Sequence, residues 1–302
     1  MKLVGVTAIG SYWSPWFPYT IASIYNVCDQ VVVANNGFDF DNFPRTEPLD
    51  RATAWIKRLD VNGKIVELRD VTPGRLNHNY PIGTQRAAND RRKQGGEGYW
   101  YDLRGLNLTA ANEEAVKLGA DWILKIDSDE VCYSDVDQLA DMLRLNWTGT
   151  SVFHQLEFAG DVGPDSCYLA DPPPSSPYID TAQTYRADPE TWYIGGGAIV
   201  NLREERLEST VFHCAHLREA NPWHLTRGEK LEHFYGRVLW RLYTNDYGYM
   251  SDEVRAEARA KAETMLARVK TPFSGKPPQA CSYQDPLGYI RRISRTVVSE
   301  HG

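Results

Sequence analysis

The residues best placed to do chemistry are two aspartates, Asp127 and Asp129, which directly follow a short apolar segment. Residues 122–126 read Trp-Ile-Leu-Lys-Ile, are too few for a helix and are bounded by turn residues, which predicts an interior strand of a parallel sheet. In open α/β sheets, ligands bind beyond the carboxyl ends of the strands. Two carboxylates at such a place suit Mg²⁺ or Mn²⁺, and the ion usually completes its shell with water and substrate phosphates. The sequence therefore predicts a metal-bound diphosphate at this turn.

Context distinguishes this pair from two other Asp-x-Asp triplets, at residues 39–41 and 135–137. The triplet is expected about once by chance in a chain of this length, so the motif alone indicates little. Here a predicted helix ends at Gly119, a common residue type just after a helix, and the apolar strand follows at once. A helix-capping aspartate beside a solvated one is the structural alternative. A calcium-binding EF-hand loop is excluded, because Val131 and Cys132 stand at its third ligand position and its glycine position.

The composition is that of a globular protein, with 42% hydrophobic and 24% charged residues in a chain of 302. The net charge of −7 argues against a nucleic-acid partner, which would require a basic face, but not against a nucleotide held through a metal. Five scattered cysteines without a Cys-x-x-Cys pair favour reduced thiols in the cytoplasm. No apolar run approaches the ~18 residues of a membrane span. We therefore expect a cytoplasmic protein without a membrane span.

The elements that must position the aspartates are predicted from the spacing of apolar residues. Strands alternate with helices up to residue 130, which indicates βαβ units and a parallel sheet with right-handed crossovers. Residues 70–101 form a long polar loop, and loops of that length are usually functional or mobile. Ser14 is the predicted N-cap of the first helix, with Pro15 at its first position. The predicted strands are residues 3–9, 30–34, 64–68, 122–126, 151–158, 181–186 paired with 192–201, and 210–217; the predicted helices are residues 14–27, 51–59, 104–118, 135–145, 229–243 and 252–269.

Over roughly residues 3–243 the chain resembles the GT-A glycosyltransferases, especially the family 2-like group. The resemblance rests first on Asp127-Ser128-Asp129, which matches the metal-binding Asp-x-Asp motif of that family. Asn35-Asn36-Gly37 follows the second strand, where members often carry Asp-Asp-Gly-Ser. A second anchor is the stretch at residues 211–218, Val-Phe-His-Cys-Ala-His-Leu-Arg, because members often place a late His near an Arg on a strand. The resemblance implies an α/β fold of GT-A type, Rossmann-like, with a mostly parallel sheet flanked by helices, a mixed C-terminal half and C-terminal helices.

The implied domain organisation is a catalytic domain followed by an extension. Residues 1–245 would form the GT-A-like domain, of which residues 1–130 bind the nucleotide sugar and residues 131–245 bind the acceptor and close the metal site. Residues 246–302 would form a C-terminal helical extension and tail.

The implied activity is that of a metal-dependent glycosyltransferase of the hexosyltransferase type. It would move a sugar from a UDP- or GDP-linked donor to a glycan, protein or small-molecule acceptor. Mn²⁺ or Mg²⁺ would be held by Asp127 and Asp129, with His213 as the preferred third ligand and His216 as the alternative, since strand alternation places these two on opposite faces. A zinc site built from His213, Cys214 and His216 is disfavoured, because neighbouring strand residues point apart. The implied donor-binding residues are Thr7, Ile9, Asn35, Asn36, Asn107, Asp127 and Arg218.

The general base is the part of the pattern that the chain lacks. Many inverting relatives carry a His-Glu in a Trp-x-Gly-x-x-His-Glu-like stretch, whereas residues 192–199 read Trp-Tyr-Ile-Gly-Gly-Gly-Ala-Ile. The nearby acids are Asp188 and Glu190, which join Asp129 as candidate catalytic residues. Both an inverting and a retaining outcome stay open.

Two other functions are compatible with the same fold. A sugar nucleotidyltransferase usually has a glycine-rich, basic loop after its first strand, but residues 10–14, Gly-Ser-Tyr-Trp-Ser, hold one glycine and no Lys or Arg. A non-catalytic carbohydrate-binding protein would explain the missing His-Glu but not the retained aspartates and late histidine. Metal-dependent turnover distinguishes a transferase from a non-catalytic carbohydrate-binding protein.

Overall fold

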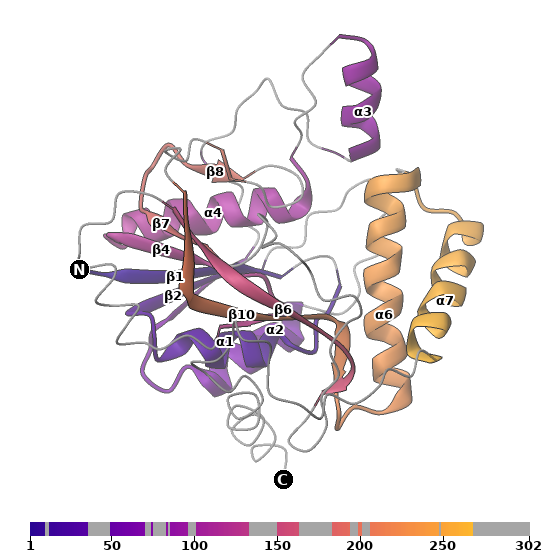
Figure 1. Cartoon of the computed structure of the whole chain (residues 1–302), viewed down its shortest axis with the longest axis horizontal. Helices are drawn as coiled ribbons and strands as arrows, with labels where there is room; N and C mark the ends of the chain where they lie inside the picture. The colour runs from indigo at the N-terminus through magenta and orange to yellow at the C-terminus, as the bar shows by residue number, and fades with distance from the viewer. Residues whose placement is uncertain are drawn as a thin grey trace.

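A computed structural model describes residues 1–9, 12–35, 49–69, 74, 83, 85–95, 101–132, 150–162, 183–193, 199–200, 206–247 and 249–267. Within them, a central sheet has the strand order β3-β2-β1-β4-β7-β6-β10-β5 (Figure 1). The first four strands of the chain are parallel to one another, as predicted. Their near-continuous apolar sequences suit strands that are covered on both faces. These strands are β1 (Leu3–Ala8), β2 (Gln30–Ala34), β3 (Ile65–Leu68) and β4 (Trp122–Lys125).

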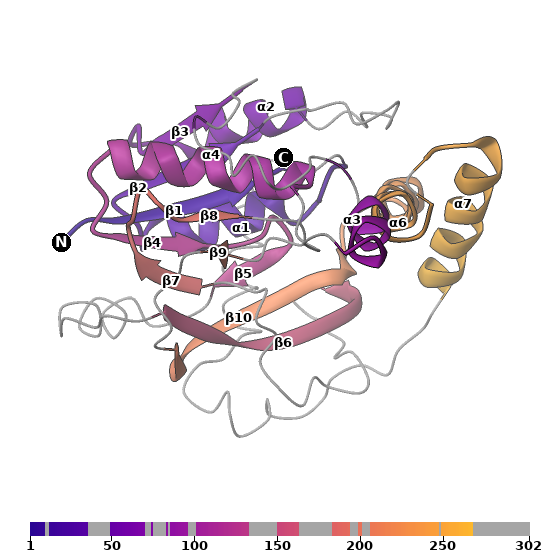
Figure 2. The same ribbon diagram turned by 90° about the horizontal axis from the view of Figure 1, so that it is seen from above.

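Helices cover the two faces of the parallel strands (Figure 2). Helices α1 (Phe17–Tyr25) and α2 (Leu49–Leu59) contribute to a core cluster with one set of strand side chains, including Leu3, Val31 and Leu124. Helix α4 (Leu103–Lys117) contributes to the cluster on the other face, with Val4, Val32 and Ile123. Alternate residues of each strand thus enter opposite cores. The predicted α/β class, with a mostly parallel sheet between helices, is confirmed.

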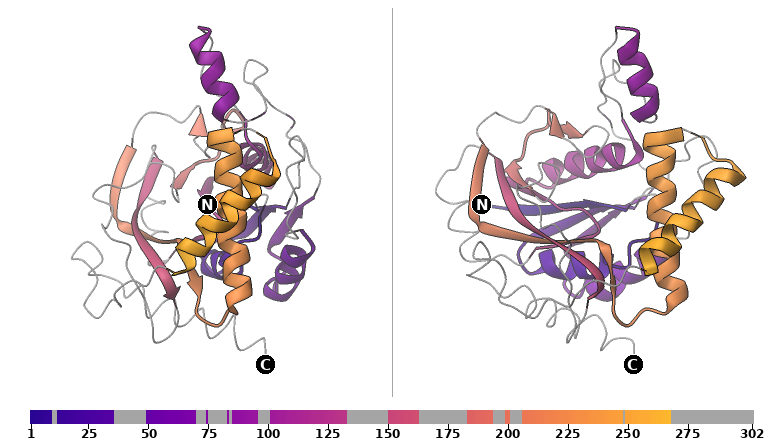
Figure 3. Two further views of the ribbon diagram at one scale, coloured as in Figure 1. Left: turned by 90° about the vertical axis from the view of Figure 1, so that its right-hand side faces the viewer. Right: turned by 45° about the vertical axis from the view of Figure 1, so that its right-hand side comes forward.

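The second half of the sheet is mixed. Strand β7 (Gln183–Arg186) runs antiparallel to both β4 and β6 (Thr150–Val162). Strand β10 (Arg206–Pro222) is parallel to β6 and antiparallel to the short β5 (Glu130–Cys132). Figure 3 shows β6 and β10 side by side as long curved strands.

The prediction of a strand pair between residues 181–186 and 192–201 is wrong. Strand β7 pairs with β4 and β6, while β8 (Trp192–Tyr193) pairs with β9 (Ile199–Val200) in a separate two-stranded sheet. Apolar alternation identifies strands but not their partners, which explains the error.

In the part of the chain that the structure describes, three α-helices lie outside the two covering layers. Helix α6 (Arg227–Arg241) begins with a capping box between Thr226 and Glu229 and continues into the π-helix η2 (Leu242–Tyr247). Helix α7 (Asp252–Ala267) packs against α6 through their own apolar cluster. Helices α6 and α7 lie beyond the carboxyl end of β1 (Figure 1). Helix α3 (Gln85–Lys93) falls within the segment that was predicted to be a loop.

The first helix also begins later than predicted, with its N-cap at Trp16 instead of Ser14 and its first residue at Phe17 instead of Pro15. The hydroxyl of Ser14 accepts a hydrogen bond from the Trp16 N–H, and its carbonyl accepts one from the Phe17 N–H, so a turn precedes the helix. The predicted helix at 135–145 and residues 268–302 of the predicted extension and tail lie outside the described residues. None of the helices that the structure describes combines the length and the apolar character needed to span a bilayer.

Candidate functional site

The two aspartates lie where the strand order of the sheet reverses. The chain moves from β1 outward to β2 and β3, then returns to place β4 on the other side of β1. The crevice at such a reversal, beyond the carboxyl ends of the strands, is the usual ligand site of open α/β sheets. Asp127 and Asp129 flank the turn that leads from β4 into β5. The predicted placement of the aspartates beyond a parallel strand agrees with this topology.

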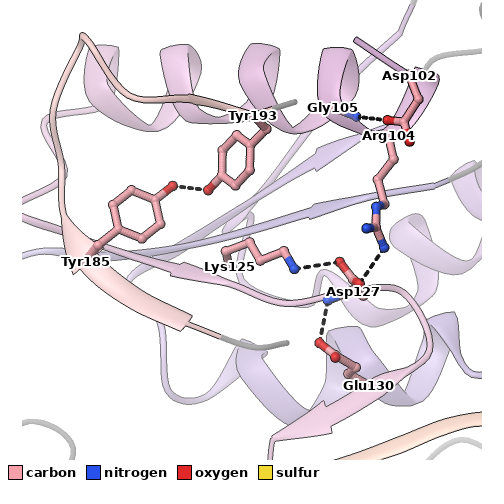
Figure 4. A network of polar contacts seen from close by, with 8 residues as sticks. All are labelled: Asp102, Arg104, Gly105, Lys125, Asp127, Glu130, Tyr185 and Tyr193. Atoms are coloured by element: carbon pink, nitrogen blue, oxygen red, sulfur yellow. Dashed lines mark hydrogen bonds and ion pairs between the residues drawn. The ribbon is translucent and has the colours of Figure 1, made fainter. Parts of the chain in front are cut away.

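Asp127 is held by two cations (Figure 4). Its Oδ2 lies 2.9 Å from the Arg104 guanidinium, and its Oδ1 lies 3.0 Å from Nζ of Lys125. The Lys125 side chain is only 1% exposed, because β4 turns it toward the core under α4. Burial alone would raise the pKa of Asp127, but Arg104 and Lys125 lower it to about 2. Asp127 is therefore ionised, and each of its two carboxylate oxygens already forms an ion pair.

Asp129 differs from Asp127 in having an available carboxylate. Its side chain is half-buried and makes no hydrogen bond or ion pair with the residues that the structure describes. Its backbone is nevertheless fixed, since its carbonyl accepts a hydrogen bond of 2.8 Å from the Leu217 N–H of β10. The turn thus presents one carboxylate with a well-defined backbone position and no partner among those residues.

Glu130, the residue after the motif, is a buried acid. It is 1% exposed, and its carboxyl accepts a hydrogen bond of 2.9 Å from the Asp127 N–H, which closes the turn. Burial raises the pKa of Glu130, and the charge of Asp127 raises it further, to about 8. Glu130 is therefore expected to be protonated at neutral pH in the folded protein.

Glu130→Gln is expected to make stability less dependent on pH. The raised pKa of Glu130 means that the native state retains a proton that the unfolded chain has lost, so wild-type stability falls as pH rises from about 4.5 to about 8. Gln cannot ionise but still accepts from the Asp127 N–H. The variant should gain on wild type by up to ~1.4 kcal/mol per pH unit in this window. Urea unfolding of both proteins from pH 5 to 8.5 measures this, and a constant difference across that range would contradict it.

Strand β10 borders the site, because it pairs with β5 directly after the acidic turn. His216 pairs in register with Glu130, is 6% exposed, and its charge acts on Asp127. Arg218 follows on the same strand. The structure therefore brings the alternative late histidine, His216, to the acidic turn, whereas the side chain of His213 lies outside the described residues.

Tyr12 and Arg237 bring two further segments to the same place. Burial and then the charge of Asp129 raise the pKa of Tyr12, while Arg237, Arg104 and Arg218 lower it, so the phenol lies among these charges. Arg237 comes from α6, and Tyr12 from the loop that follows β1.

The other predicted donor-binding residues occupy the neighbouring strand ends. Thr7 is fully buried, and its hydroxyl has no hydrogen-bond partner among the described residues. The Ile9 carbonyl accepts a hydrogen bond of 3.3 Å from the amide of Asn107, which ties α4 to the end of β1. Asn35 donates to the carboxylate of Glu67 and so joins β2 to β3. Asn36 lies outside the described residues.

Asp188 and Glu190 are not brought to the acidic turn. Strand β7 runs antiparallel to β4, so the chain after Arg186 emerges beside Trp122, at the start of β4. Ala187 accordingly donates its N–H to the carbonyl of Asp121. The two candidate bases therefore lie at the opposite end of β4 from Asp127.

The donor set at the turn fits one kind of metal complex. Within the residues that the structure describes, no group of three or more His, Cys, Asp or Glu side chains gathers to hold an ion. Asp127 is already paired with two cations, and Asp129 offers one carboxylate. Mg²⁺ commonly binds through one or two carboxylates plus substrate phosphates and water. These residues fit an ion that arrives with a diphosphate.

Sequence reasoning missed several residues of this site. Lys125 had a signal, because a lysine inside an apolar strand requires a buried partner, and Asp127 is on the same face two residues later. Arg104 and Arg237 had none, since their positions depend on how distant helices pack. Tyr12 and Glu130 lay beside recognised motifs without a spacing that assigned them a role.

Comparison with known proteins gives limited information. No protein-family model matches the chain, and no curated protein sequence matches it. Solved structures with partial similarity include a 4-diphosphocytidyl-2C-methyl-D-erythritol synthase from Anaerococcus prevotii, at 10% identity over 62% of this chain and 70% of that chain, with a TM-score of 0.30. A protein described as a glucose-1-phosphate thymidylyltransferase from Bacillus anthracis matches at 10% identity over 61% and 72%, with a TM-score of 0.30. HddC from Yersinia pseudotuberculosis matches at 12% identity over 62% and 74%, with a TM-score of 0.29. These scores are too low to indicate an activity for this chain.

Proposed function

We propose that this protein is a metal-dependent transferase that binds a nucleoside diphosphate sugar and moves the sugar to an acceptor. The observation that carries the proposal is the carboxylate of Asp129, which has no partner among the described residues and stands at the strand-order reversal. Asp129 interacts electrostatically with Arg237, and the charges of Asp129, Arg237, Arg104 and Arg218 all act on the phenol of Tyr12, so cations from separate elements gather in this region. One carboxylate among several guanidinium groups suits a metal-bound diphosphate, whose remaining negative charge the guanidinium groups balance.

The two aspartates have different roles in this proposal. Asp129 would hold Mn²⁺ or Mg²⁺, and such an ion acts as a Lewis acid on a diphosphate leaving group. Asp127 would not need to coordinate the ion, because its ion pairs with Arg104 and Lys125 fix the shape of the turn. The guanidinium of Arg218 would bind phosphate oxygens, and His216 would border the same side of the site.

A sugar nucleotidyltransferase would use related ligands in a different reaction. It would join a nucleoside triphosphate to a sugar phosphate and release pyrophosphate, whereas sugar transfer releases a nucleoside diphosphate. The loop after β1 carries no basic residue at positions 10–14, and the cations of this site come instead from α4, β4, β10 and α6. This distribution of charge favours sugar transfer.

Thermal stability in the presence of nucleotides tests the proposal. UDP, GDP and their common sugar conjugates are each added with and without Mn²⁺, with UMP and GMP as controls that lack the second phosphate. A ligand present at 100 times its Kd stabilises the native state by about 2.7 kcal/mol, which raises the melting temperature by several degrees. We expect a shift that requires both Mn²⁺ and the diphosphate.

Other outcomes identify the rival functions. A shift with nucleoside triphosphates but not with diphosphates, together with pyrophosphate release in the presence of a sugar phosphate, would replace the proposal with nucleotidyl transfer. Stabilisation by free sugars alone would indicate a carbohydrate-binding protein. No shift with any nucleotide, with or without metal, would contradict the proposed function.

A further inference from the structure

Strand β10 contains a bulge beside the acidic turn. His216 pairs with Glu157 of β6, and the next pair is Glu219 with Ala159. Between these two pairs β10 advances by three residues and β6 by two. The extra residue interrupts the pairing of β10 with β6 at Leu217 and Arg218. Bulges of this kind bend a strand and re-aim its side chains, and they are frequent next to active sites.

The backbone of β10 at the bulge contacts two other parts of the site, of which the first continues the antiparallel register of β10 with β5. The Leu217 N–H donates to the carbonyl of Asp129 at 2.8 Å. The Arg218 carbonyl accepts a hydrogen bond of 2.7 Å from the guanidinium of Arg237. The same guanidinium pairs at 2.5 Å with Glu219, the residue at which the ladder resumes. Arg237 therefore holds the bulge at both of its C-terminal residues.

Helix α6 is itself fixed against the start of the site. A Cβ built on Gly236 would lie 2.7 Å from Cβ of Tyr12, a distance that side-chain rotation cannot relieve. Glycine is disfavoured in a helix interior, so its presence here indicates a required close approach between α6 and the loop after β1. Arg237, the next residue, has a side chain that is only 13% exposed. Its guanidinium therefore has little freedom.

We propose that Arg237 is a positioning residue, which locks the bulge of β10 so that Arg218 and the Asp129 turn keep the geometry that binds a metal-diphosphate. Helix α6, which lies outside the parallel half of the sheet, thus takes part in the site through the contact of Arg237 with the backbone of β10. Its link to the diphosphate rests on the proposed function, but the link between Arg237 and the turn does not.

Two measurements on the full chain test these links separately. Amide hydrogen exchange, followed on peptides that contain residues 127–132 and 214–219, reports the bulge and the turn without any ligand. Titration of Mn²⁺ with UDP or GDP, followed by thermal shift, reports the binding geometry. The variants are Arg237→Met and Arg237→Lys, and Arg259→Met is the matched control, because Arg259 makes an exposed ion pair with Glu232 between α6 and α7.

We expect faster exchange only near the bulge and the turn, and nucleotide affinities that decrease from wild type through Arg237→Lys to Arg237→Met. Arg237→Met should speed exchange in both peptides but not in β1 or β2. It should also weaken the apparent affinity for the Mn²⁺–nucleotide by about 10-fold or more, as loss of a residue that orients a metal-binding group typically does. Arg237→Lys, which can still donate to the Arg218 carbonyl, should recover part of both effects. Arg259→Met should resemble wild type.

Failure of each proposal is recognisable. Unchanged exchange at both peptides in Arg237→Met would overturn the positioning role, whatever the nucleotide result. Faster exchange spread over the whole chain, without recovery in Arg237→Lys, would also overturn it and indicate general destabilisation. If wild type binds no nucleotide with Mn²⁺, the proposed function fails, and the exchange experiment alone decides the role of Arg237.

Discussion

Asp127→Asn is expected to lower the free energy of unfolding by about 3–5 kcal/mol, because removing one partner of a buried ion pair leaves the other charge inadequately compensated. Lys125 cannot reach water readily, since its side chain is only 1% exposed. Asn keeps the shape of the side chain but not its charge, and Arg104 loses the same partner. Such a loss would be a large fraction of the ~5–15 kcal/mol that stabilises an ordinary protein. Urea unfolding at pH 7 measures it.

Asp90→Asn is the matched control for this substitution. Asp90 pairs with Lys93 on the surface of α3, where both side chains are more than half exposed. Exposed pairs of this kind contribute little, so the control should stay within about 0.5 kcal/mol of wild type. A loss below about 1 kcal/mol in Asp127→Asn would mean that the buried pair does not hold the turn.

The ion pairs of Asp127 also predict how acid affects the fold. Its pKa lies near 2 in the native state, below the ordinary value of 3.8. A depressed carboxyl pKa stabilises the native state above about pH 3.8, and that contribution is lost as pH falls through about 2. The stability difference between Asp127→Asn and wild type should therefore be largest near neutrality and shrink as pH falls from about 3.8 to about 2.

Asp129→Asn is expected to abolish the Mn²⁺-dependent stabilisation by nucleotides while leaving the fold intact. The carboxylate makes no hydrogen bond or ion pair among the described residues, so its replacement should change the free energy of unfolding by about 0.5 kcal/mol or less. The hydrogen bond from Leu217 goes to the backbone carbonyl of Asp129, which the substitution preserves. The measurement is the thermal shift produced by Mn²⁺ with the diphosphate that stabilises wild type.

The two asparagine variants form an informative pair because they change neighbouring residues of one motif. We expect Asp127→Asn to lose stability and Asp129→Asn to lose ligand response. A Mn²⁺-dependent shift of full size in Asp129→Asn would exclude Asp129 as the metal ligand. An equal loss of stability in both variants would show that the aspartates act together in the fold.

Several features of this protein follow from local sequence alone. Short apolar runs such as residues 122–126 specify buried strands, and their alternation with helices requires parallel pairing through right-handed crossovers. That argument also places Asp127 and Asp129 at the carboxyl edge of the sheet, because they directly follow one of its strands. The position of Lys125 also follows from local sequence, since strand periodicity alone puts its side chain on the face shared with Asp127.

Other features depend on which distant segments meet. The antiparallel direction of β7 carries Asp188 and Glu190 to the far end of β4, and strand direction has no signature in the apolar pattern of a four-residue segment. The partnership of Arg104 with Asp127 arises because α4 runs back across the sheet and brings its first turn to the end of β4. The bulge of β10 and its contact with Arg237 require β5, β6 and α6 to be assembled around one strand. Local periodicity encodes which face of an element is buried, whereas the identity of the charged partner across a packed interface is set only when the elements have docked.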